Sequence, residues 1–287
     1  MIDLHFHSSY SDGKLSVPEL VGLLKNSGIK VCALTDHDTV AGVLELEQAL
    51  TGTGIVSIPA VELTALHNDR EVHLLAYDFD VAQMREVLDE RNHIVARQKQ
   101  EEMKQAVSLF RRAGIEISSD LQPADKRPVG YTIAVDICSN EKNQEFFVKN
   151  YGRRFTRDDV YFEYQVPNKA CAVQRSGVTI EWIIHKLQAI AKDLIIAHPF
   201  VAPSIVMQPL EEQDIERMLE LGITGLEVYH DQTSDSQIQW LEKIVQQKGL
   251  NYTGGSDFHK LDDTTPLGHY DKDREVKSFK LLNYHFG

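Results

Sequence analysis

His5 and His7 stand on either side of Phe6 in an apolar stretch near the beginning of the sequence. In an extended strand, side chains two residues apart point to the same side, so both imidazoles can reach one point in space while Phe6 faces a core. Neutral imidazole is a common ligand for zinc, manganese and iron. The opening stretch therefore predicts a pair of metal ligands on a buried strand.

Further histidines and carboxylates follow other apolar stretches, where strands are expected to end. A single histidine is usually an ordinary core or surface residue, but packing does not explain so many at strand ends. Mixed imidazole and carboxylate ligands are typical of hydrolytic metal sites, and one carboxylate can bridge two ions. No cysteine accompanies them, which argues against a purely structural zinc site. The set comprises His5, His7, Asp12, Asp36, His37, Asp38, Glu62, His73, His198, Glu227, His230, Asp257 and His259.

Alternating strands and helices are expected to position these residues. This rhythm favours a mainly parallel sheet, closed into a barrel or wound open. In α/β barrels the loops after the strands lie together on one face, which would gather the side chains listed above. After the opening strand, the expected strands are 30–35, 55–63, 71–77, 194–197, 225–229 and 251–253, and the expected helices are 16–28, 40–50, 81–113, 179–192, 211–221 and 234–248.

The rhythm is interrupted between residues 114 and 178, where Pro123, Pro128 and Pro167 occur among several aromatic residues. This stretch predicts a small, mostly helical insertion. Residues 91–175 hold 15 of the 30 Lys and Arg but 11 of the 43 Asp and Glu, a net charge of +4, whereas the rest of the chain carries −17. An acidic body suits divalent cations, and a basic segment beside it could attract an anionic substrate.

Composition places the chain among soluble globular proteins. Apolar residues make up 42% of the 287 residues and charged residues 25%, values that argue against disorder. No signal peptide or membrane span is expected, and three widely spaced cysteines, Cys32, Cys138 and Cys171, form neither a disulfide framework nor a zinc pattern. We therefore expect a cytoplasmic protein with reduced thiols, no membrane association and no stable protein partner.

Several short motifs combine these residues in a familiar order. They are Asp3-Leu4-His5-Phe6-His7-Ser8 with Asp12-Gly13, Thr35-Asp36-His37-Asp38, Val61-Glu62, His73-Leu74-Leu75-Ala76-Tyr77, Ala197-His198-Pro199 and Gly254-Gly255-Ser256-Asp257-Phe258-His259. With these motifs the chain resembles the PHP (polymerase and histidinol phosphatase) family. The resemblance implies an α/β fold, a distorted (β/α)7 TIM-like barrel formed by residues 1–100 and 179–287, with a cap subdomain inserted at residues 101–178.

The resemblance also implies two to three divalent metal ions, Mn²⁺, Zn²⁺ or Fe²⁺. Carried over to the matching positions, the first ion takes His5, His7, Glu62 and Asp257. A second shares Glu62 and adds His73 and His198. A third takes Asp12, His37 and His259.

The implied activity is hydrolysis of a phosphate ester by a metal-activated hydroxide. His230 and Asp36 are the candidate catalytic residues, His230 as the proton donor to the leaving group and Asp36 as a partner that supports the ligands. Arg127 is the candidate phosphate contact, since a guanidinium can bind two oxygens at once. His230 and Tyr229 are candidates for further substrate contact.

The motifs are compatible with several substrates. The insertion is most similar to the branch of nucleoside 3′,5′-bisphosphate phosphatases and 5′-to-3′ exoribonucleases, although the Arg-Pro-His sequence of that branch reads Arg127-Pro128-Val129 here. We expect a phosphatase acting on a small phosphorylated metabolite, above all a nucleoside 3′,5′-bisphosphate. The alternatives are an exoribonuclease acting on short RNA, a histidinol-phosphatase-like enzyme and a noncatalytic metal-binding accessory module.

Overall fold

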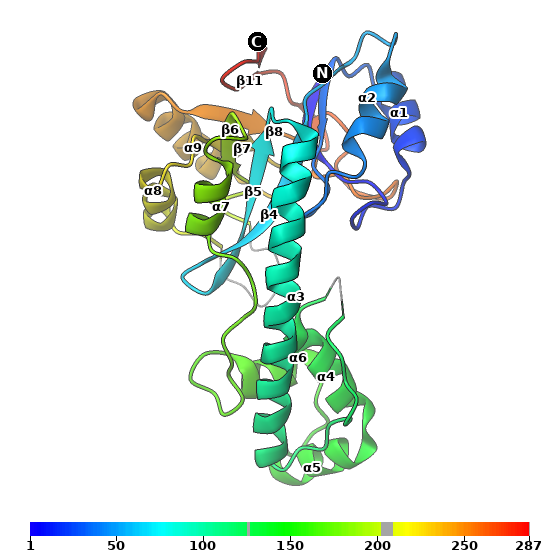
Figure 1. Cartoon of the computed structure of the whole chain (residues 1–287), viewed down its shortest axis with the longest axis vertical. Helices are drawn as coiled ribbons and strands as arrows, with labels where there is room; N and C mark the ends of the chain where they lie inside the picture. Colours follow the sequence, from blue (N-terminus) through cyan, green and yellow to red (C-terminus); the bar gives the residue numbers. More distant parts are fainter. Residues whose placement is uncertain (125–126, 202–208, 287) are drawn as a thin grey trace. The chain divides into compact units, whose positions relative to one another are not determined.

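The computed structural model describes residues 1–124, 127–201 and 209–286 (Figure 1). The chain divides into two compact units. Unit 1 comprises Met1–Glu90 together with Val178–Gly287, and unit 2 comprises Arg91–Gly177. Unit 2 therefore begins at Arg91, before the start of the insertion expected at residues 101–178. The helix Val81–Arg112 runs across this boundary.

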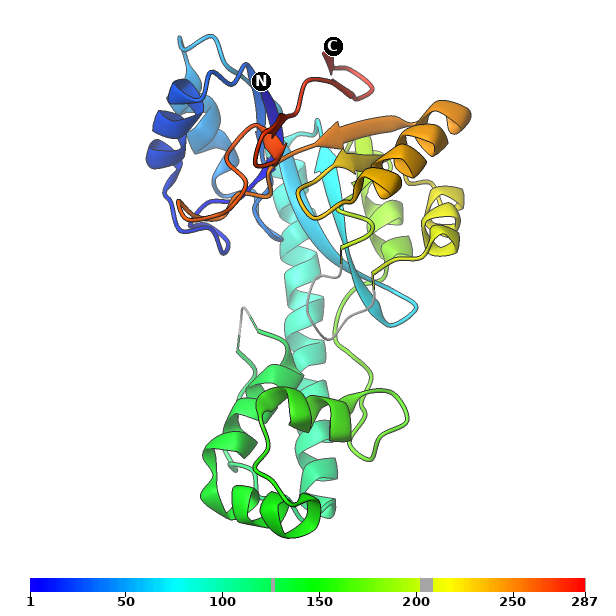
Figure 2. The same cartoon turned by 180° about the vertical axis from the view of Figure 1, so that it is seen from behind.

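A three-stranded parallel sheet begins unit 1. Its strands β1 (Ile2–Phe6), β2 (Val31–Leu34) and β3 (Val56–Ser57) pair in that order. Helices α1 (Val17–Asn26) and α2 (Val43–Leu50) connect them and lie side by side (Figure 2). Every residue of β1 is buried, and His7, which follows the strand, is buried as well.

The second sheet of unit 1 has seven strands in the order β12-β11-β8-β7-β6-β5-β4. Helices α7 (Ile180–Leu187), α8 (Glu212–Glu220) and α9 (Asp235–Lys248) lie along it (Figure 1). The strands are β4 (Ala60–His67), β5 (Arg70–Tyr77), β6 (Asp193–Ile196), β7 (Gly225–Tyr229), β8 (Asn251–Gly254), β11 (Phe279–Lys280) and β12 (His285–Phe286). A separate antiparallel pair follows β8, formed by β9 (His269–Asp271) and β10 (Arg274–Glu275).

The sheet is less parallel than the sequence suggests. β4 pairs antiparallel with β5, and β5 pairs antiparallel with β6, whereas β6, β7 and β8 run parallel. The connection between β4 and β5 is too short for a crossover helix, so the two strands form a hairpin. Its turn residues, Asn68 and Asp69, adopt φ of 51° and 61°, which Asn and Asp tolerate better than most residues.

Two isolated parallel bridges join the sheets of unit 1. One links Phe6 with Phe258 beyond β8, and the other links His37 with Glu62 in β4. One core cluster also contains side chains from both sheets, among them Leu4, Tyr77 and Ile195, and the Tyr77 hydroxyl donates to the Leu4 carbonyl over 2.7 Å. These contacts hold the ends of β1 and β2 against the seven-stranded sheet, close to the residues after β8 and to Glu62 in β4.

Unit 2 is mostly helical. α3 (Val81–Arg112) begins in unit 1 and ends in unit 2, and matches the single long helix expected over residues 81–113. The other helices are α4 (Val129–Ser139), α5 (Glu141–Tyr151), α6 (Arg157–Val160) and the π-helix η1 (Tyr161–Gln165). Phe110, Ile133 and Phe147 lie in its own core. None of the helices in the described residues is both long and apolar enough to cross a membrane.

Candidate metal centre

Glu62 lies at the middle of the histidine cluster. It is only 1% exposed, although a carboxylate buried in this way requires strong compensation. Its Oε1 lies 2.8 Å from His73 Nδ1 and 3.1 Å from His198 Nε2. Both histidines come from neighbouring strands or their ends, so the antiparallel pairing of β4 with β5 and of β5 with β6 places these groups around one oxygen.

The second oxygen of Glu62 faces three other histidines. Its Oε2 lies 3.2 Å from His7 Nε2, 3.3 Å from His5 Nε2 and 3.2 Å from His37 Nδ1. The parallel bridge between His37 and Glu62 brings the end of β2 to β4. With different imidazoles on its two oxygens, Glu62 has the geometry of a carboxylate that can bridge two ions.

Asp257 completes the group around His5 and His7. Its Oδ1 lies 3.0 Å from His7 Nε2 and 3.3 Å from His5 Nε2. Its backbone has φ of 50°, and His198 has φ of 27°. Side-chain-bearing residues seldom adopt such values, and strained positions of this kind gather at functional sites.

A third group lies toward the surface. His259 Nε2 is 3.3 Å from Asp12 Oδ1, and His37 Nε2 and His7 Nδ1 are each 3.9 Å from the same oxygen. Asp12 is half exposed, so this group is the most open to solvent. Its carboxylate and imidazoles are the donors that Mn²⁺, Zn²⁺ and Fe²⁺ accept.

Among the described residues, three sets of ligand atoms are compact enough to hold a metal ion. The first is the predicted group of His5, His7, Glu62 and Asp257. The second joins His37 to Glu62 and His73, whereas the sequence assigns His198 to that place; His198 nevertheless contacts the same Glu62 oxygen as His73. The third contains the predicted Asp12, His37 and His259 and adds His7.

Two buried nitrogen atoms show that these residues fit metal ions. Within the described part of the chain, His7 Nδ1 and His37 Nδ1 are buried without a hydrogen-bond partner. His37 Nδ1 does lie 3.2 Å from Glu62 Oε2, but without the geometry of a hydrogen bond. A buried polar atom without a partner is costly, and a metal ion would satisfy such a lone pair.

The carboxylates control the protonation of the histidines. Burial by itself would lower the pKa of His7 and of His73, but Asp257 and Glu62 raise the pKa of His7 to about 9, and Glu62 raises that of His73 to about 10. Burial lowers the pKa of His37 to about 4. Burial would raise the pKa of Glu62, but His37, His5 and His73 hold it well below its usual range. Protons therefore balance the buried carboxylates when no metal is bound.

Metal binding is expected to release protons. With pKa values raised to about 9 and about 10, His7 and His73 are protonated near neutral pH, and an imidazole must lose a proton to bind a metal. Because folded-state protonation persists up to these pKa values, Mn²⁺ affinity should rise with pH by about tenfold per pH unit for each proton displaced. Calorimetric titration in two buffers of different ionisation enthalpy measures this release. Binding without proton release would contradict the arrangement.

Glu227 holds two of the histidines in place. It is fully buried in β7, and its Oε1 accepts from His5 Nδ1 over 2.9 Å. Its Oε2 accepts from the backbone N–H of His198 over 2.7 Å. The first bond leaves Nε2 of His5 free to face Glu62, and the second fixes the strained backbone at His198. The sequence places Glu227 among the strand-end residues but assigns no role to it.

Replacing Glu227 by glutamine should weaken Mn²⁺ binding by about 10- to 100-fold, since carboxylates behind ligating histidines have effects of this size. The measurement is a Mn²⁺ titration of the full chain. Glu242→Gln is the matched control, because Glu242 is exposed and accepts from the Tyr229 hydroxyl. Equal affinities for the two variants would show that Glu227 does not position the ligands.

Asp36 and Asp3 organise the loops around the centre. Asp36 accepts from the backbone N–H and the hydroxyl of Ser8 over 2.7 and 2.6 Å, and from the Ser11 hydroxyl over 2.6 Å. It thus fixes the loop between His7 and Asp12.

Burial raises the pKa of Asp3 to about 6. Asp3 accepts from the Ser256 hydroxyl, a role that sequence reasoning missed although Asp3 and His5 are two residues apart in one strand.

The remaining candidates have different locations. His230 is buried in the centre, with Nε2 3.4 Å from Asp257 Oδ2, and its Nδ1 accepts from the Gln232 N–H over 3.3 Å. Tyr229 instead donates to Glu242 and lines a cavity of about 360 Å³. None of the candidate ligands is among the described residues that line this cavity. Arg127 belongs to unit 2, where its guanidinium carbon lies 5.1 Å from the centre of the Tyr131 ring.

Comparison with known proteins gives a consistent picture. The family model described as "PHP domain" matches residues 3–167. A 5′-3′ exoribonuclease from Haemophilus influenzae is 27% identical over 264 residues, which cover 90% of this chain and 89% of the relative. A 3′,5′-nucleoside bisphosphate phosphatase from Chromobacterium violaceum is 25% identical over 266 residues, covering 90% and 87%.

Solved structures share the mixed α/β fold. A candidate metal-dependent phosphoesterase from Bifidobacterium adolescentis has a TM-score of 0.61 at 22% identity, and the match covers 95% of this chain and 93% of the other. An amidohydrolase from Chromobacterium violaceum with bound sulfate has a TM-score of 0.60 at 24% identity, covering 92% and 89%. At these identities the structures support the fold alone.

Proposed function

Because the chain belongs to the PHP domain family and is a metal-dependent phosphoesterase, we propose that its substrate is a nucleoside 3′,5′-bisphosphate, from which it removes one phosphate. The observation that carries the proposal is the convergence of five imidazoles on the two oxygens of Glu62. Such a cluster suits a compact phosphate monoester, whose terminal oxygens carry most of the negative charge.

We assign two to three divalent ions to the centre, as Mn²⁺, Zn²⁺ or Fe²⁺. Bound ions of this kind neutralise phosphoryl oxygens and lower the pKa of a coordinated water to about 7. Glu62 would hold two of them, with support from the five histidines around it. The chain's own contribution is to fix these side chains in advance, through Glu227 behind His5 and through Asp36 beneath the loop that carries Asp12.

His230 is our candidate for the proton donor. Its buried ring lies between Asp257 on one side and Asp231 on the other, at 3.4 and 3.3 Å. Burial would lower its pKa, but the hydrogen bond with Asp257 and the charge of Glu227 raise it. Because Nδ1 accepts from Gln232, the proton of this histidine lies on Nε2, from where it could protonate the departing alkoxide. Arg127 of unit 2 is the proposed phosphate contact.

The barrel form of unit 1 is part of the proposal. Strands β1 and β2 meet the seven-stranded sheet through the bridges Phe6 to Phe258 and His37 to Glu62. These bridges support a distorted barrel in which β1, β2, β4, β5, β6, β7 and β8 surround the core. Unit 2 is then the insertion that we propose as the cap.

A second candidate function is a 5′-to-3′ exoribonuclease acting on short RNA. It is favoured by the exoribonucleases of Haemophilus influenzae and of Escherichia coli, the latter 24% identical over 273 residues that cover 90% of this chain and 85% of the relative. The same ligands would serve both reactions, since each breaks a phosphorus–oxygen bond. The two functions differ in the length of substrate that must be accommodated.

A direct assay separates these functions. With Mn²⁺ added, we expect phosphate release from adenosine 3′,5′-bisphosphate with a larger kcat/KM than from a 5′-phosphorylated RNA pentamer or from histidinol phosphate. Faster cleavage of the pentamer to mononucleotides would favour the exoribonuclease. Preference for histidinol phosphate would favour a histidinol-phosphatase-like enzyme. If none of the three substrates reacted while Mn²⁺ bound normally, all three substrate assignments would be refuted and the metal-binding accessory module would become the favoured alternative.

A further inference from the structure

Unit 2 contains an exposed aromatic ring with two guanidinium groups beside it. Tyr131, in the first turn of α4, is 37% exposed. The guanidinium carbons of Arg127 and Arg157 lie 5.1 and 5.0 Å from the centre of its ring. Arg157 also donates to the Tyr131 hydroxyl. These distances are typical of cation–π contacts, which hold a guanidinium in place without neutralising it.

The charge of these two arginines is not cancelled. Within the described ranges, neither Arg127 nor Arg157 forms an ion pair with a carboxylate. Arg153 and Arg154 in the same unit differ, because Asp159 binds Arg153 through two oxygens and Glu141 binds Arg154 in the same way. Two uncompensated cations therefore lie beside one exposed ring, in a unit whose sequence has a net positive charge.

The chemistry of this arrangement selects a class of ligand. A guanidinium fork binds two oxygens of a phosphate, and a second fork nearby suits a chain of phosphates better than a single one. Exposed aromatic rings and guanidinium planes also stack on bases, whatever their sequence. Both arginines are exposed on the surface of unit 2, where an extended strand can reach them.

We propose that Tyr131, Arg127 and Arg157 form a contact site for the backbone of single-stranded RNA. This inference rests on the proposed function, since it extends the substrate from one nucleotide to a strand. Tyr131 holds both guanidinium groups, which bind successive phosphates, and its ring offers an apolar surface to a base. The site lies entirely within unit 2, and Arg157 adds to Arg127 a second phosphate contact, which an oligonucleotide uses and a mononucleotide does not.

The test uses the full chain with Mn²⁺ and a fluorescein-labelled RNA pentamer with hydrolysis-resistant phosphorothioate linkages. Fluorescence anisotropy should show that Arg157→Gln raises the Kd about tenfold and lowers the salt slope by about 0.7, as expected for one lost phosphate contact. Tyr131→Leu should raise the Kd to a similar degree, because it removes the ring that holds both arginines.

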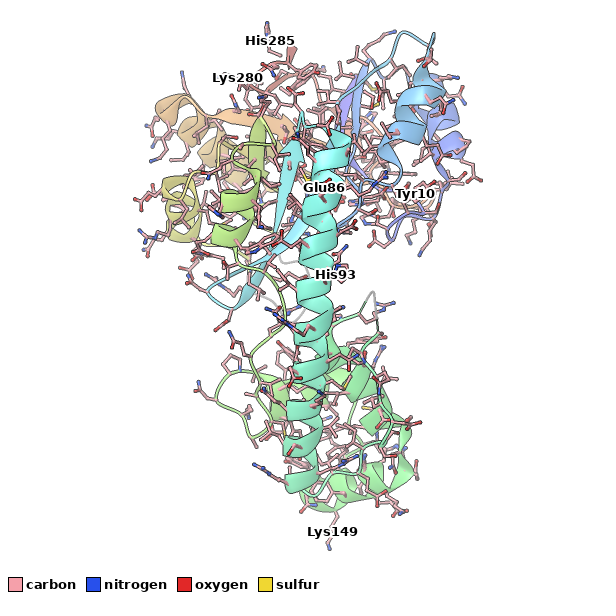
Figure 3. The ribbon with its side chains drawn as sticks, in the orientation of Figure 1. Tyr10, Glu86, His93, Lys149, Lys280 and His285 are labelled. Atoms are coloured by element: carbon pink, nitrogen blue, oxygen red, sulfur yellow. The ribbon has the colours of Figure 1, made fainter. Side chains whose placement is uncertain are left out.

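Lys149→Gln is the matched control. Lys149 projects from α5 away from the rest of unit 2 (Figure 3) and forms no ion pair with any residue that the structure describes. Lys149→Gln removes one positive charge, as Arg157→Gln does, but leaves the contacts of Tyr131 unchanged. Equal effects of Arg157→Gln and Lys149→Gln would overturn the site, because they would reflect only general charge attraction. Full competition by polyglutamate of equal charge would overturn it for the same reason.

Phosphate release from adenosine 3′,5′-bisphosphate, measured on the same variants, separates this inference from the proposed function. We expect Arg157→Gln to lower kcat/KM for a 5′-phosphorylated pentamer about tenfold and to change that for the bisphosphate less than twofold. Loss of RNA affinity in a chain that hydrolyses neither substrate would support the contact site while refuting the proposed function. Unchanged RNA affinity in a chain that hydrolyses the bisphosphate would overturn the contact site alone.

Discussion

Replacing Glu62 by glutamine is expected to reduce phosphate release by about 1,000-fold or more. The substitution keeps the size of the side chain but removes the charge that faces five imidazoles. A neutral amide cannot bridge two cations as a carboxylate does, and loss of one strong electrostatic contact in such a site costs several kcal/mol in the transition state. The measurement is kcat/KM for the preferred phosphate ester at saturating Mn²⁺.

Glu86→Gln is the control for this substitution. Glu86 lies on α3 with its side chain exposed (Figure 3), so the same chemical change should alter kcat/KM by less than twofold. Metal content must be measured on both variants. If Glu62→Gln retained its metal and more than a tenth of its activity, Glu62 would be a structural carboxylate and the bridging role would be wrong.

Gly255→Ala is expected to reduce the stability of unit 1 by about 3 kcal/mol, at the upper end of what an added methyl group costs in a packed interior. A Cβ at this position would lie 2.4 Å from the Cβ of His5 and 2.5 Å from its backbone nitrogen. β1 is buried along its whole length and cannot move aside without disturbing the core. The same displacement would move His5 away from Glu62, so Mn²⁺ affinity should fall with stability.

Urea unfolding followed by tryptophan fluorescence measures this effect on unit 1 alone, because both tryptophans, Trp182 and Trp240, lie in that unit. Gly22→Ala is the control. Gly22 lies within α1, where an added Cβ would meet no atom within 4 Å. It should raise the free energy of unfolding by about 0.5–1 kcal/mol, since alanine favours a helix more than glycine does. Similar results for both variants would show that β1 tolerates displacement.

The sequence predicts the clustering of the candidate ligands because its signals are local. The same-face spacing of His5 and His7 needs only the geometry of a strand, and the structure brings both rings to Glu62 and Asp257. The group that contains Asp12, His37 and His259 also assembles as expected. Residues that follow parallel strands could be anticipated because such strands carry their loops to a common edge, but Glu62 and His73 lie inside the antiparallel strands β4 and β5.

Contacts that depend on irregular backbone could not be anticipated. The register between β7 and β8 shifts between Glu227 and Tyr229, and the Tyr229 hydroxyl bonds to Glu242 of α9. The place of His37 beside Glu62 depends on an isolated bridge. The hairpin at Asn68 and Asp69 had a turn signal in the sequence, but the expected alternation of strands and helices obscured it.

Anomalous diffraction from crystals grown with Mn²⁺ tests the central claim most directly. We predict at least two manganese peaks within coordination distance of Glu62, one on each of its oxygens, with a further peak beside Asp12 and His259. Peaks that leave Glu62 uncoordinated, or a single ion bound only through His5 and His7, would contradict the assignment of Glu62 as the bridging ligand.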